Sequence, residues 1–226
     1  MIEDLLPDSV VAVEIHGQAE AENITLYPEE AALVAQSVAK RRREFALVRS
    51  CARRAMEKLG VPPQPVLPGE RGAPQWPAGL TGSMTHCDGY CAAALVRAAD
   101  LTSLGIDAEP HGPLPDGVLD SVSLPGERIR LRHLAESHPG IHWDRLLFSA
   151  KESVYKAWFP LTGTWLDFAE ADIEILVDQG EFPRGRLRAA LLVPGPVLAG
   201  QRRGVFEGRW TVRDGLVATS VVVPHA

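Results

Sequence analysis

The chain has 226 residues, 46% of them hydrophobic, and its 23 Lys and Arg residues are outnumbered by 29 Asp and Glu, for a formal net charge of −6. That apolar fraction is enough to bury a full core, as one domain or as two closely packed halves. The negative charge disfavours a nucleic-acid partner bound through general electrostatics. The acidic start of the chain, and the absence of an apolar run near the roughly 20 residues of a membrane span, predict a cytoplasmic protein without a membrane segment.

The cysteine pattern argues against a disulfide framework. Cys51, Cys87 and Cys91 are odd in number, and the spacing of Cys87 and Cys91 finds no second pair of ligands elsewhere in the chain. A structural zinc site would need such a second pair. We therefore expect free, buried thiols.

The first long element is a helix, which we expect to begin after residues 28–30 and to run, with or without a break, to Leu59. Apolar residues recur at helical spacing along its second half, at Phe45, Val48, Ala52, Met56 and Leu59. The other side is basic, with Arg41, Arg42, Arg43, Arg49, Arg53 and Arg54. A solvated charged face accounts for most of these arginines, and one or two are candidates for binding phosphate.

A Pro- and Gly-rich loop is predicted for residues 61–80. A strand of small residues follows at 90–96, and residues 101–106 are expected to be its partner strand. The turn-rich segment 110–113 makes residue 110 the best candidate for a boundary between two halves.

Beyond that boundary, helical patterns cover residues 115–119, 127–136 and 143–158, and β-type runs cover residues 171–177, 187–192, 205–212 and 216–223. Helices and antiparallel-looking strands thus occur in each half, which predicts an α+β fold. The order of helix and then strands in both halves permits an internal duplication without establishing it.

Two short motifs carry chemistry. In the predicted strand end Gly105-Ile106-Asp107-Ala108-Glu109, the side chains of Asp107 and Glu109 point to the same face. In the later predicted helix, Glu152 and Lys156 stand one turn apart, and Lys151 flanks them. Carboxylates that converge from two elements form an oxygen-lined site of the kind that Mg²⁺ prefers. The adjacent lysines suggest that a phosphate accompanies the metal.

Other catalytic motifs are missing from the sequence. It contains no Walker-type phosphate loop, no Gly-x-Gly-x-x-Gly, no Gly-x-Ser-x-Gly and no His-Glu-x-x-His. P-loop hydrolysis, α/β-hydrolase chemistry and zinc hydrolysis therefore lose their support. His86 is the histidine with polar neighbours, Ser83 and Thr85, although a lone histidine is more often a structural hydrogen-bonding residue.

Three motifs in this order resemble the actinobacterial branch of the Sfp-type, enterobactin-synthetase-like 4′-phosphopantetheinyl transferases: Thr85-His86 after Gly82-Ser83, residues 105–109, and residues 148–158. Residues 41–59, 72–74 and 142–145 are also similar, so the resemblance covers nearly the whole chain. It implies an enzyme that transfers the 4′-phosphopantetheine arm of coenzyme A to a serine of an acyl or peptidyl carrier protein and releases adenosine 3′,5′-bisphosphate.

The resemblance also implies an architecture. Relatives of this length are monomers of two similar α/β halves related by pseudo-twofold symmetry, with coenzyme A in the cleft between them. In this chain the halves would be residues 1–109 and 110–226. Whether the carrier serves fatty-acid, polyketide, siderophore or other non-ribosomal-peptide synthesis is left open, as is the acceptance of acyl-coenzyme A donors.

For the metal end of coenzyme A, the resemblance implies Mg²⁺ bound by Asp107, Glu109 and Glu152 beside the pyrophosphate, with Mn²⁺ as an alternative. Glu152 is assigned as the general base, or as the residue that orients a basic water, and Asp107 and Lys156 complete the catalytic group. Lys156 and Lys151 would offset pyrophosphate charge. A plain helix salt bridge from Lys156 to Glu152 is the alternative reading.

For the 3′-phosphate end, the resemblance implies His86 and Thr85, with Arg49 and Arg41 from the basic helix. Periodicity on an unbroken helix would favour Arg42 over Arg41 beside Arg49, so this choice depends on a helix break.

The adenine is expected along Gly72-Ala73-Pro74, where relatives commonly have a lysine between Gly and Pro. Ala73 occupies that position here, and Arg71 is a candidate substitute for the missing lysine.

Two rival functions remain open: a metal-dependent phosphodiesterase or nuclease, and a non-enzymatic coenzyme A-binding module. The net charge counts against the first, and the three carboxylates count against the second. A carrier-docking surface and an ordinary amphipathic segment are equally compatible with the basic and apolar residues Leu119, Val122, Leu124, Arg128, Arg130, Leu131 and Arg132.

Overall fold

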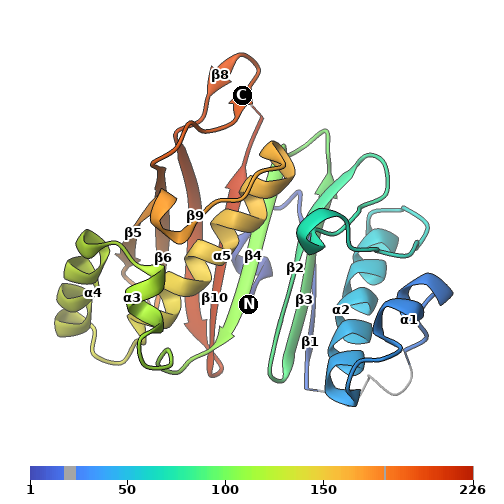
Figure 1. Ribbon diagram of the computed structural model, residues 1–226, viewed down its shortest axis with the longest axis horizontal. Coiled ribbons are helices and arrows are strands. Elements are labelled where there is room, and N and C mark those ends of the chain that lie inside the picture. The colour runs from blue at the N-terminus through green and yellow to red at the C-terminus, as the bar shows by residue number, and fades with distance from the viewer. Residues whose placement is uncertain (18–23, 181, 226) are drawn as a thin grey trace.

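The computed structural model describes residues 1–17, 24–180 and 182–225, and within them it has a mixed α/β fold with antiparallel sheets (Figure 1). A three-stranded sheet has the order β1 (Val11–His16), β3 (Tyr90–Arg97), β2 (Leu80–Cys87). A five-stranded sheet has the order β4 (Ser103–Pro110), β10 (Leu216–Val223), β9 (Val205–Arg213), β6 (Arg184–Leu191), β5 (Ala171–Asp178). The short strands β7 (Val197–Leu198) and β8 (Gln201–Arg202) pair with each other.

The helices agree in position with the sequence patterns except for α3, which begins three residues later than the pattern at residues 115–119. They are α1 (Pro28–Val34), α2 (Ala39–Lys58), α3 (Val118–Val122), α4 (Pro125–Ser137) and α5 (Trp143–Thr162), with 3-10 turns η1 (Glu3–Leu5), η3 (Glu70–Gly72) and η4 (Phe168–Glu170). The helix predicted from residue 30 to Leu59 is therefore confirmed, with a break at residues 35–38.

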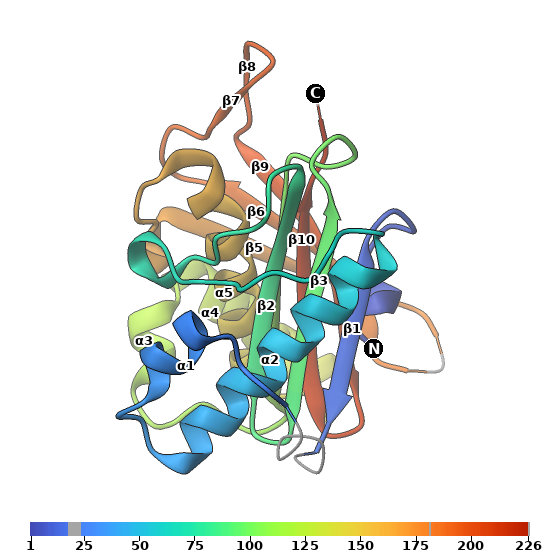
Figure 2. The same ribbon diagram turned by 90° about the vertical axis from the view of Figure 1, so that its right-hand side faces the viewer.

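Helix α2 lies along one face of the N-terminal sheet (Figure 2). Its predicted apolar stripe is buried there, since Val48, Ala52 and Met56 join one cluster with residues of β1 and β3. The small side chains of β3, which include Ala93, let the helix approach the sheet closely. This packing presents the N-terminal turns of α2 beside the end of β2 that carries His86.

Helix α5 crosses the five-stranded sheet diagonally and forms the second core (Figure 1). Gly105 of β4 is required where the two elements touch, because a Cβ atom at this position would lie 2.0 Å from the carbonyl oxygen of Ser153. The Ser149 and Ser153 hydroxyls also contact the Thr219 hydroxyl of β10, at 2.9 and 2.7 Å. These contacts fix the register of α5 on β4 and β10.

Strand β4 does not pair with β3, so the prediction that residues 101–106 form the partner of strand 90–96 is wrong. Both edges of β3 are occupied, by β1 and by β2, and β4 instead hydrogen-bonds to β10. The strand with Asp107 therefore belongs to the C-terminal sheet, although the boundary after residue 109 grouped it with the N-terminal half.

The two sheets meet where β2 runs beside β4. Here side-chain hydroxyls take the place of backbone acceptors: Ser83 Oγ accepts from the Ile106 amide at 3.0 Å, and Thr85 Oγ1 accepts from the Ala108 amide at 3.1 Å. Both side chains are buried. The two hydroxyl groups therefore satisfy buried amides of β4. These two hydrogen bonds, called here the joint between the sheets, hold β2 against β4, the strand that carries Asp107.

Among the described residues, none of the helices has both the length and the apolar character needed to span a bilayer.

The Gly105 contact predicts a strong effect of added volume. We expect Gly105→Ala to lower the free energy of unfolding by about 3 kcal/mol or more, since the methyl group would collide with helix backbone rather than with a flexible side chain. Urea denaturation monitored by circular dichroism measures this. Gly112→Ala, where a Cβ meets nothing within 4 Å, should differ little from wild type, and equal stability of the two variants would contradict the prediction.

Candidate active site

One face of α5 carries the polar side chains that meet the sheet. Arg145, Ser149, Glu152 and Lys156 are spaced by four, three and four residues, so they lie in a row along the helix. Arg145 contacts Glu109 and Lys156 contacts Asp107. The two carboxylates predicted on one face of β4 are thus each paired with a cation from α5, and Glu152 lies between these two cations along the helix.

Asp107 is the most enclosed of the three carboxylates. Its Oδ1 atom accepts hydrogen bonds from Lys156 Nζ at 2.7 Å and from Thr85 Oγ1 at 3.2 Å. Its Oδ2 atom is buried and has no hydrogen-bond partner among the described residues. A buried, unsatisfied carboxylate oxygen is costly, and it is the kind of atom that a bound cation would satisfy.

The charge of Asp107 acts on both of the other carboxylates. Burial and the charge of Asp107 raise the pKa of Glu109, and Arg145 opposes this rise. Burial raises the pKa of Glu152, the charge of Asp107 adds to the rise, and Lys156 opposes it. Repulsion of this kind is relieved by a proton or by a cation.

The residues present fit a hard divalent cation such as Mg²⁺, because Asp107, Glu109 and Glu152 supply only carboxylate oxygens. Among the described residues, however, no group of three or more His, Cys, Asp or Glu side chains is placed so that it could hold a metal ion. A cation at these carboxylates would therefore need further ligands from outside the described residues, and Asp107 Oδ2 is the buried oxygen that has no hydrogen-bond partner among them.

A second group of polar side chains lies at the end of β2. Arg41 Nη1 is 2.8 Å from His86 Nε2, and a carboxylate oxygen of Glu44 is 3.9 Å from the same nitrogen. Burial lowers the pKa of His86, and the charges of Arg41, Lys156 and Arg49 add to that decrease. His86 is thus a neutral imidazole that accepts from Arg41, in a region of positive potential.

Arg49 is more deeply buried than Arg41 and His86. Its guanidinium stacks over the Phe45 ring at 3.7 Å, and its Nε atom donates to the Val66 carbonyl at 3.3 Å. Burial lowers the pKa of Arg49 to about 10, so it remains charged at neutral pH. Arg41, Arg42 and Arg49 all lie within the unbroken helix α2, so the break at residues 35–38 does not decide between the first two. Arg41 contacts His86, whereas Arg42 donates to the Ser37 carbonyl ahead of the helix.

The loop before β2 reaches across to the C-terminal half. Arg71 adopts a left-handed conformation, with φ of 52°, and its guanidinium lies 5.5 Å from the centroid of the Trp165 ring. The rings of Trp165 and Tyr155 pack against each other, with 4.9 Å between their centroids. Both aromatic rings line a hollow of about 100 Å³ that also reaches Glu152. Arg71, Gly72 and Pro74 thus belong to a loop that bridges the two halves close to the carboxylates.

Comparison with known proteins identifies the family. A sequence model described as the 4′-phosphopantetheinyl transferase N-terminal domain matches residues 29–96, and one described as the 4′-phosphopantetheinyl transferase superfamily matches residues 103–194. The chain is 58% identical to 4′-phosphopantetheinyl transferase Svp of Streptomyces mobaraensis, over 99% of this chain and 89% of the relative. The chain belongs to the 4′-phosphopantetheinyl transferase superfamily.

Two further relatives agree with this assignment. 4′-Phosphopantetheinyl transferase PptT of Mycobacterium tuberculosis is 50% identical over 88% of this chain and 87% of its own length. Enterobactin synthase component D of Salmonella typhi is 35% identical over 53% of this chain and 49% of its own length. The resemblance inferred from the three motifs is therefore confirmed, and the chain is a transferase.

Two of the predicted site residues are engaged elsewhere in this transferase. Lys151 is buried on a neighbouring face of α5, where its Nζ atom contacts Glu127 at 2.9 Å and the Phe168 and Ala171 carbonyls. The Thr85 hydroxyl is taken up by the joint between the sheets. The structure therefore does not bring Lys151 to the carboxylate cluster, and the Thr85 hydroxyl already both donates and accepts a hydrogen bond within the protein.

Sequence reasoning missed Arg145 and Glu44. Arg145 lies seven residues before Glu152 and eleven before Lys156, and this helical spacing alone could have found it. Glu44 lies only three residues after Arg41, but its approach to His86 depends on how α2 packs against β2, which no local pattern encodes.

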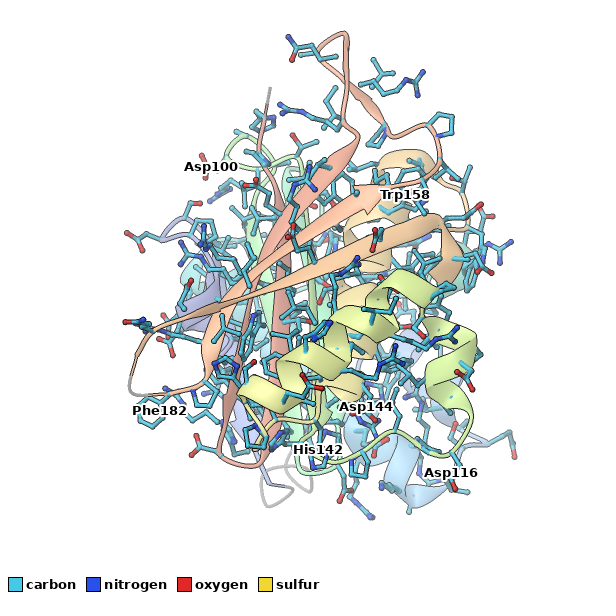
Figure 3. All side chains as sticks on the ribbon, turned by 90° about the vertical axis from the view of Figure 1, so that its left-hand side faces the viewer. Asp100, Asp116, His142, Asp144, Trp158 and Phe182 are labelled. Carbon is cyan, nitrogen blue, oxygen red and sulfur yellow. The ribbon has the colours of Figure 1, made fainter. Side chains whose placement is uncertain are left out.

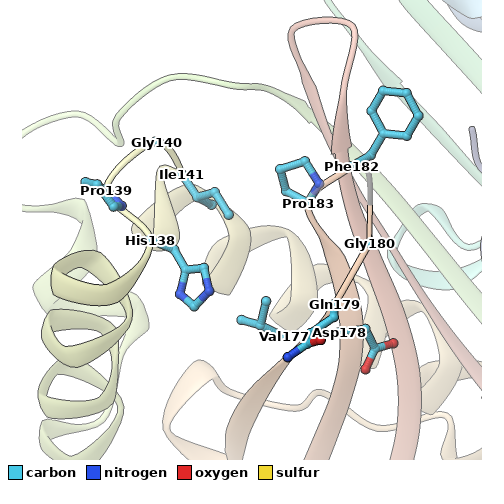
Figure 4. Close-up of a pocket in the computed structure, with 10 residues that line it drawn as sticks. All are labelled: His138, Pro139, Gly140, Ile141, Val177, Asp178, Gln179, Gly180, Phe182 and Pro183. Atoms are coloured by element: carbon cyan, nitrogen blue, oxygen red, sulfur yellow. The ribbon is translucent and has the colours of Figure 1, made fainter.

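The larger hollow of about 720 Å³ lies elsewhere, between the α4–α5 connection and the β5–β6 connection (Figure 4). His138, Ile141 and Phe182 are among its lining residues, and none of the predicted site residues contributes to it. Its open shape and the absence of converging charges give no reason to prefer it over the carboxylate cluster.

The surroundings of His86 predict its titration. We expect the imidazole in the folded protein to protonate below its ordinary value of 6.5, since burial and neighbouring cations both disfavour the charged form. In the unfolded chain the imidazole binds its proton at a higher pH than in the folded protein. The contribution of neutral His86 to the free energy of unfolding is therefore fully present above pH 6.5, and it is lost as the pH falls through the pKa of the folded protein. NMR titration of the ring checks this: Arg41→Gln should raise the midpoint, and a wild-type midpoint above 6.5 would contradict the assignment.

Proposed function

We propose that this transferase moves the 4′-phosphopantetheine arm of coenzyme A onto a serine hydroxyl of an apo acyl or peptidyl carrier protein and releases adenosine 3′,5′-bisphosphate. The observation that carries the proposal is the buried, unsatisfied oxygen of Asp107 beside Lys156, on the same site as Glu152. The names of the Svp and PptT relatives support the reaction class.

A ligand with phosphates at both ends suits the charge distribution. Asp107, Glu152 and Lys156 would take the pyrophosphate with its metal, whereas Arg41, Arg49 and His86 would take the 3′-phosphate. Support for this separation comes from the two groups lying on different elements yet within electrostatic range, since Lys156 contributes to the lowered pKa of His86.

The adenine end of coenzyme A can be assigned to the loop that precedes β2. The adenine would lie along the loop of Gly72 and Pro74, with Arg71 as the basic contact from that loop.

The proposed cation is Mg²⁺ or Mn²⁺, held by Asp107, Glu109 and Glu152. When bound, such a cation neutralises pyrophosphate charge and makes the phosphorus more electrophilic. Lys156 would hold Asp107 in place through its 2.7 Å contact and would offset further phosphate charge.

In the reaction, the serine oxygen bonds to the phosphorus that carries the pantetheine arm, and the bond from that phosphorus to the oxygen of adenosine 3′,5′-bisphosphate breaks. Glu152 accepts the serine proton, directly or through a water that it orients. Burial and the nearby charge of Asp107 raise the pKa of Glu152, which makes this carboxylate a stronger base than an exposed glutamate.

The architecture is part of the same proposal. We infer two similar halves, residues 1–109 and 110–226, with coenzyme A in a cleft between them, and with β4 joining the second sheet by hydrogen bonds. Support comes from the parallel roles of α2 and α5, each packed on an antiparallel sheet. We further propose a monomer that acts in the cytoplasm, where coenzyme A and apo carrier proteins are found.

Fewer side chains of α3 and α4 are available to contact a carrier protein than the sequence suggested. Val122 and Leu131 are buried, Arg128 pairs with Asp120, and Arg130 contacts Asp172. Of the apolar side chains on this surface, Ile129 is exposed and Leu119 and Leu124 are partly exposed.

The proposed reaction is tested by incubating the protein with coenzyme A, Mg²⁺ and several apo carrier proteins, and by measuring intact carrier mass. A mass increase equal to one phosphopantetheine group is expected. No increase with any carrier would contradict the proposal, and cleavage of DNA under the same conditions would favour the rival phosphodiesterase.

Glu152→Gln should lower the rate of transfer by about 10²- to 10⁴-fold, because the amide cannot accept the serine proton. Coenzyme A binding, measured by calorimetry, should be partly retained. Glu174→Gln, a change of the same chemistry on the exposed side of β5, is the matched control and should keep wild-type turnover. Wild-type turnover in Glu152→Gln would refute the role of Glu152.

Arg49→Gln should weaken coenzyme A binding about tenfold or more, since a charge-assisted contact to phosphate is lost. Dephospho-coenzyme A lacks the 3′-phosphate, so its affinity should change little in this variant. Arg43→Gln, at an exposed position of the same helix, should leave both affinities unchanged. An equal loss for both ligands in Arg49→Gln would contradict the assignment of the 3′-phosphate.

A further inference from the structure

Arg145 makes three contacts with the end of β4 and the connection that follows it. Its Nη1 atom donates to Glu109 Oε2 at 3.1 Å, its Nε atom to the Gly112 carbonyl at 3.2 Å, and its Nη2 atom to the Pro113 carbonyl at 2.8 Å. The side chain is mostly buried, with 17% exposure. All three nitrogens of one guanidinium are thus used, which fixes its orientation on α5.

These contacts restrain Glu109 from a rigid element. Arg145 lies in the first turn of α5, and the helix backbone is itself held on β4 by the close contact at Gly105. A free glutamate side chain has several rotamers, and holding one of them costs conformational entropy whenever a ligand binds. Arg145 removes that cost in advance for Glu109.

We propose that Arg145 is a positioning residue: it holds the Glu109 carboxylate by Oε2 so that the carboxylate is oriented to receive the divalent cation. The inference rests on the metal site under the proposed function, and it assigns Arg145 no contact with substrate. Outer partners of metal-binding side chains typically contribute about 10- to 100-fold to metal affinity.

The charge of Arg145 has an opposite effect, and this makes the inference testable. A guanidinium near the site repels a cation, so an arginine that acted through its charge alone would weaken metal binding. Arg145→Lys keeps the charge but replaces the fork of three donors by a single ammonium, which cannot reach Glu109, Gly112 and Pro113 together. Arg145→Met removes both the charge and the fork.

A matched control lies in the same helical turn. Asp144 is labelled in Figure 3. Its Oδ2 atom accepts from the Leu114 amide at 2.8 Å and so ties the same connection to α5. Asp144→Asn therefore tests whether any loosening of this connection changes the site.

The experiment measures Mn²⁺ affinity by electron paramagnetic resonance, on the full chain with and without coenzyme A. We expect Arg145→Lys and Arg145→Met each to bind Mn²⁺ about tenfold more weakly than wild type, and Asp144→Asn to bind it as wild type does. In a Glu109→Gln background, Arg145→Lys should cause no further loss, because the two residues act as one unit. Circular dichroism confirms that each variant is folded.

Three outcomes overturn the inference. Wild-type Mn²⁺ affinity in Arg145→Lys, with tighter binding in Arg145→Met, shows that Arg145 acts only by charge. An equal loss in Asp144→Asn shows that the connection, and not Glu109, is what matters. If the wild-type protein itself binds no Mn²⁺, the metal site falls together with the inference, whereas transfer activity under the same conditions would still support the reaction.

Discussion

The close packing of α5 against β4 at Gly105 is the constraint on which the site depends. With no side chain at that position, the backbone of Ser153 approaches the strand, and Glu152 and Lys156 on either side of it are brought to Asp107. A larger residue would push the helix outward and separate the cation from the carboxylate. Because a buried carboxylate without its partner is strongly unfavourable, the fold and the charge arrangement reinforce each other at this contact.

The joint between β2 and β4 connects the two groups of charges. Ser83 and Thr85 satisfy the amides of Ile106 and Ala108 with hydroxyl oxygens, so the two sheets stay adjacent without merging into one continuous ladder. Thr85 also donates to Asp107, and His86 follows directly. One short strand thereby fixes the distance between the carboxylate cluster and the cationic group around His86.

Local periodicity predicted which side chains share a face better than it predicted which strands pair. The two-residue repeat of Asp107 and Glu109 and the four-residue step from Glu152 to Lys156 both hold in the structure. Lys151 was assigned to the phosphate site because it is adjacent to Glu152 in the sequence. Successive helix residues are turned by about 100°, however, and the Lys151 side chain contacts Glu127 instead. The pairing of β4 could not be predicted, because it depends on which sheet edges remain open.

The cationic group shows why burial must be considered together with charge. Burial lowers the pKa of both Arg49 and His86. Arg49, with a pKa of about 10, is still charged at neutral pH, whereas the neutral form of His86 is favoured. His86 accepts from Arg41 with Nε2, so its other ring nitrogen carries the proton and can donate to an anion without adding charge. At neutral pH the positive charge of this group therefore comes from Arg41 and Arg49, and the lowered pKa of His86 moves its protonation below the pH at which an exposed histidine would titrate.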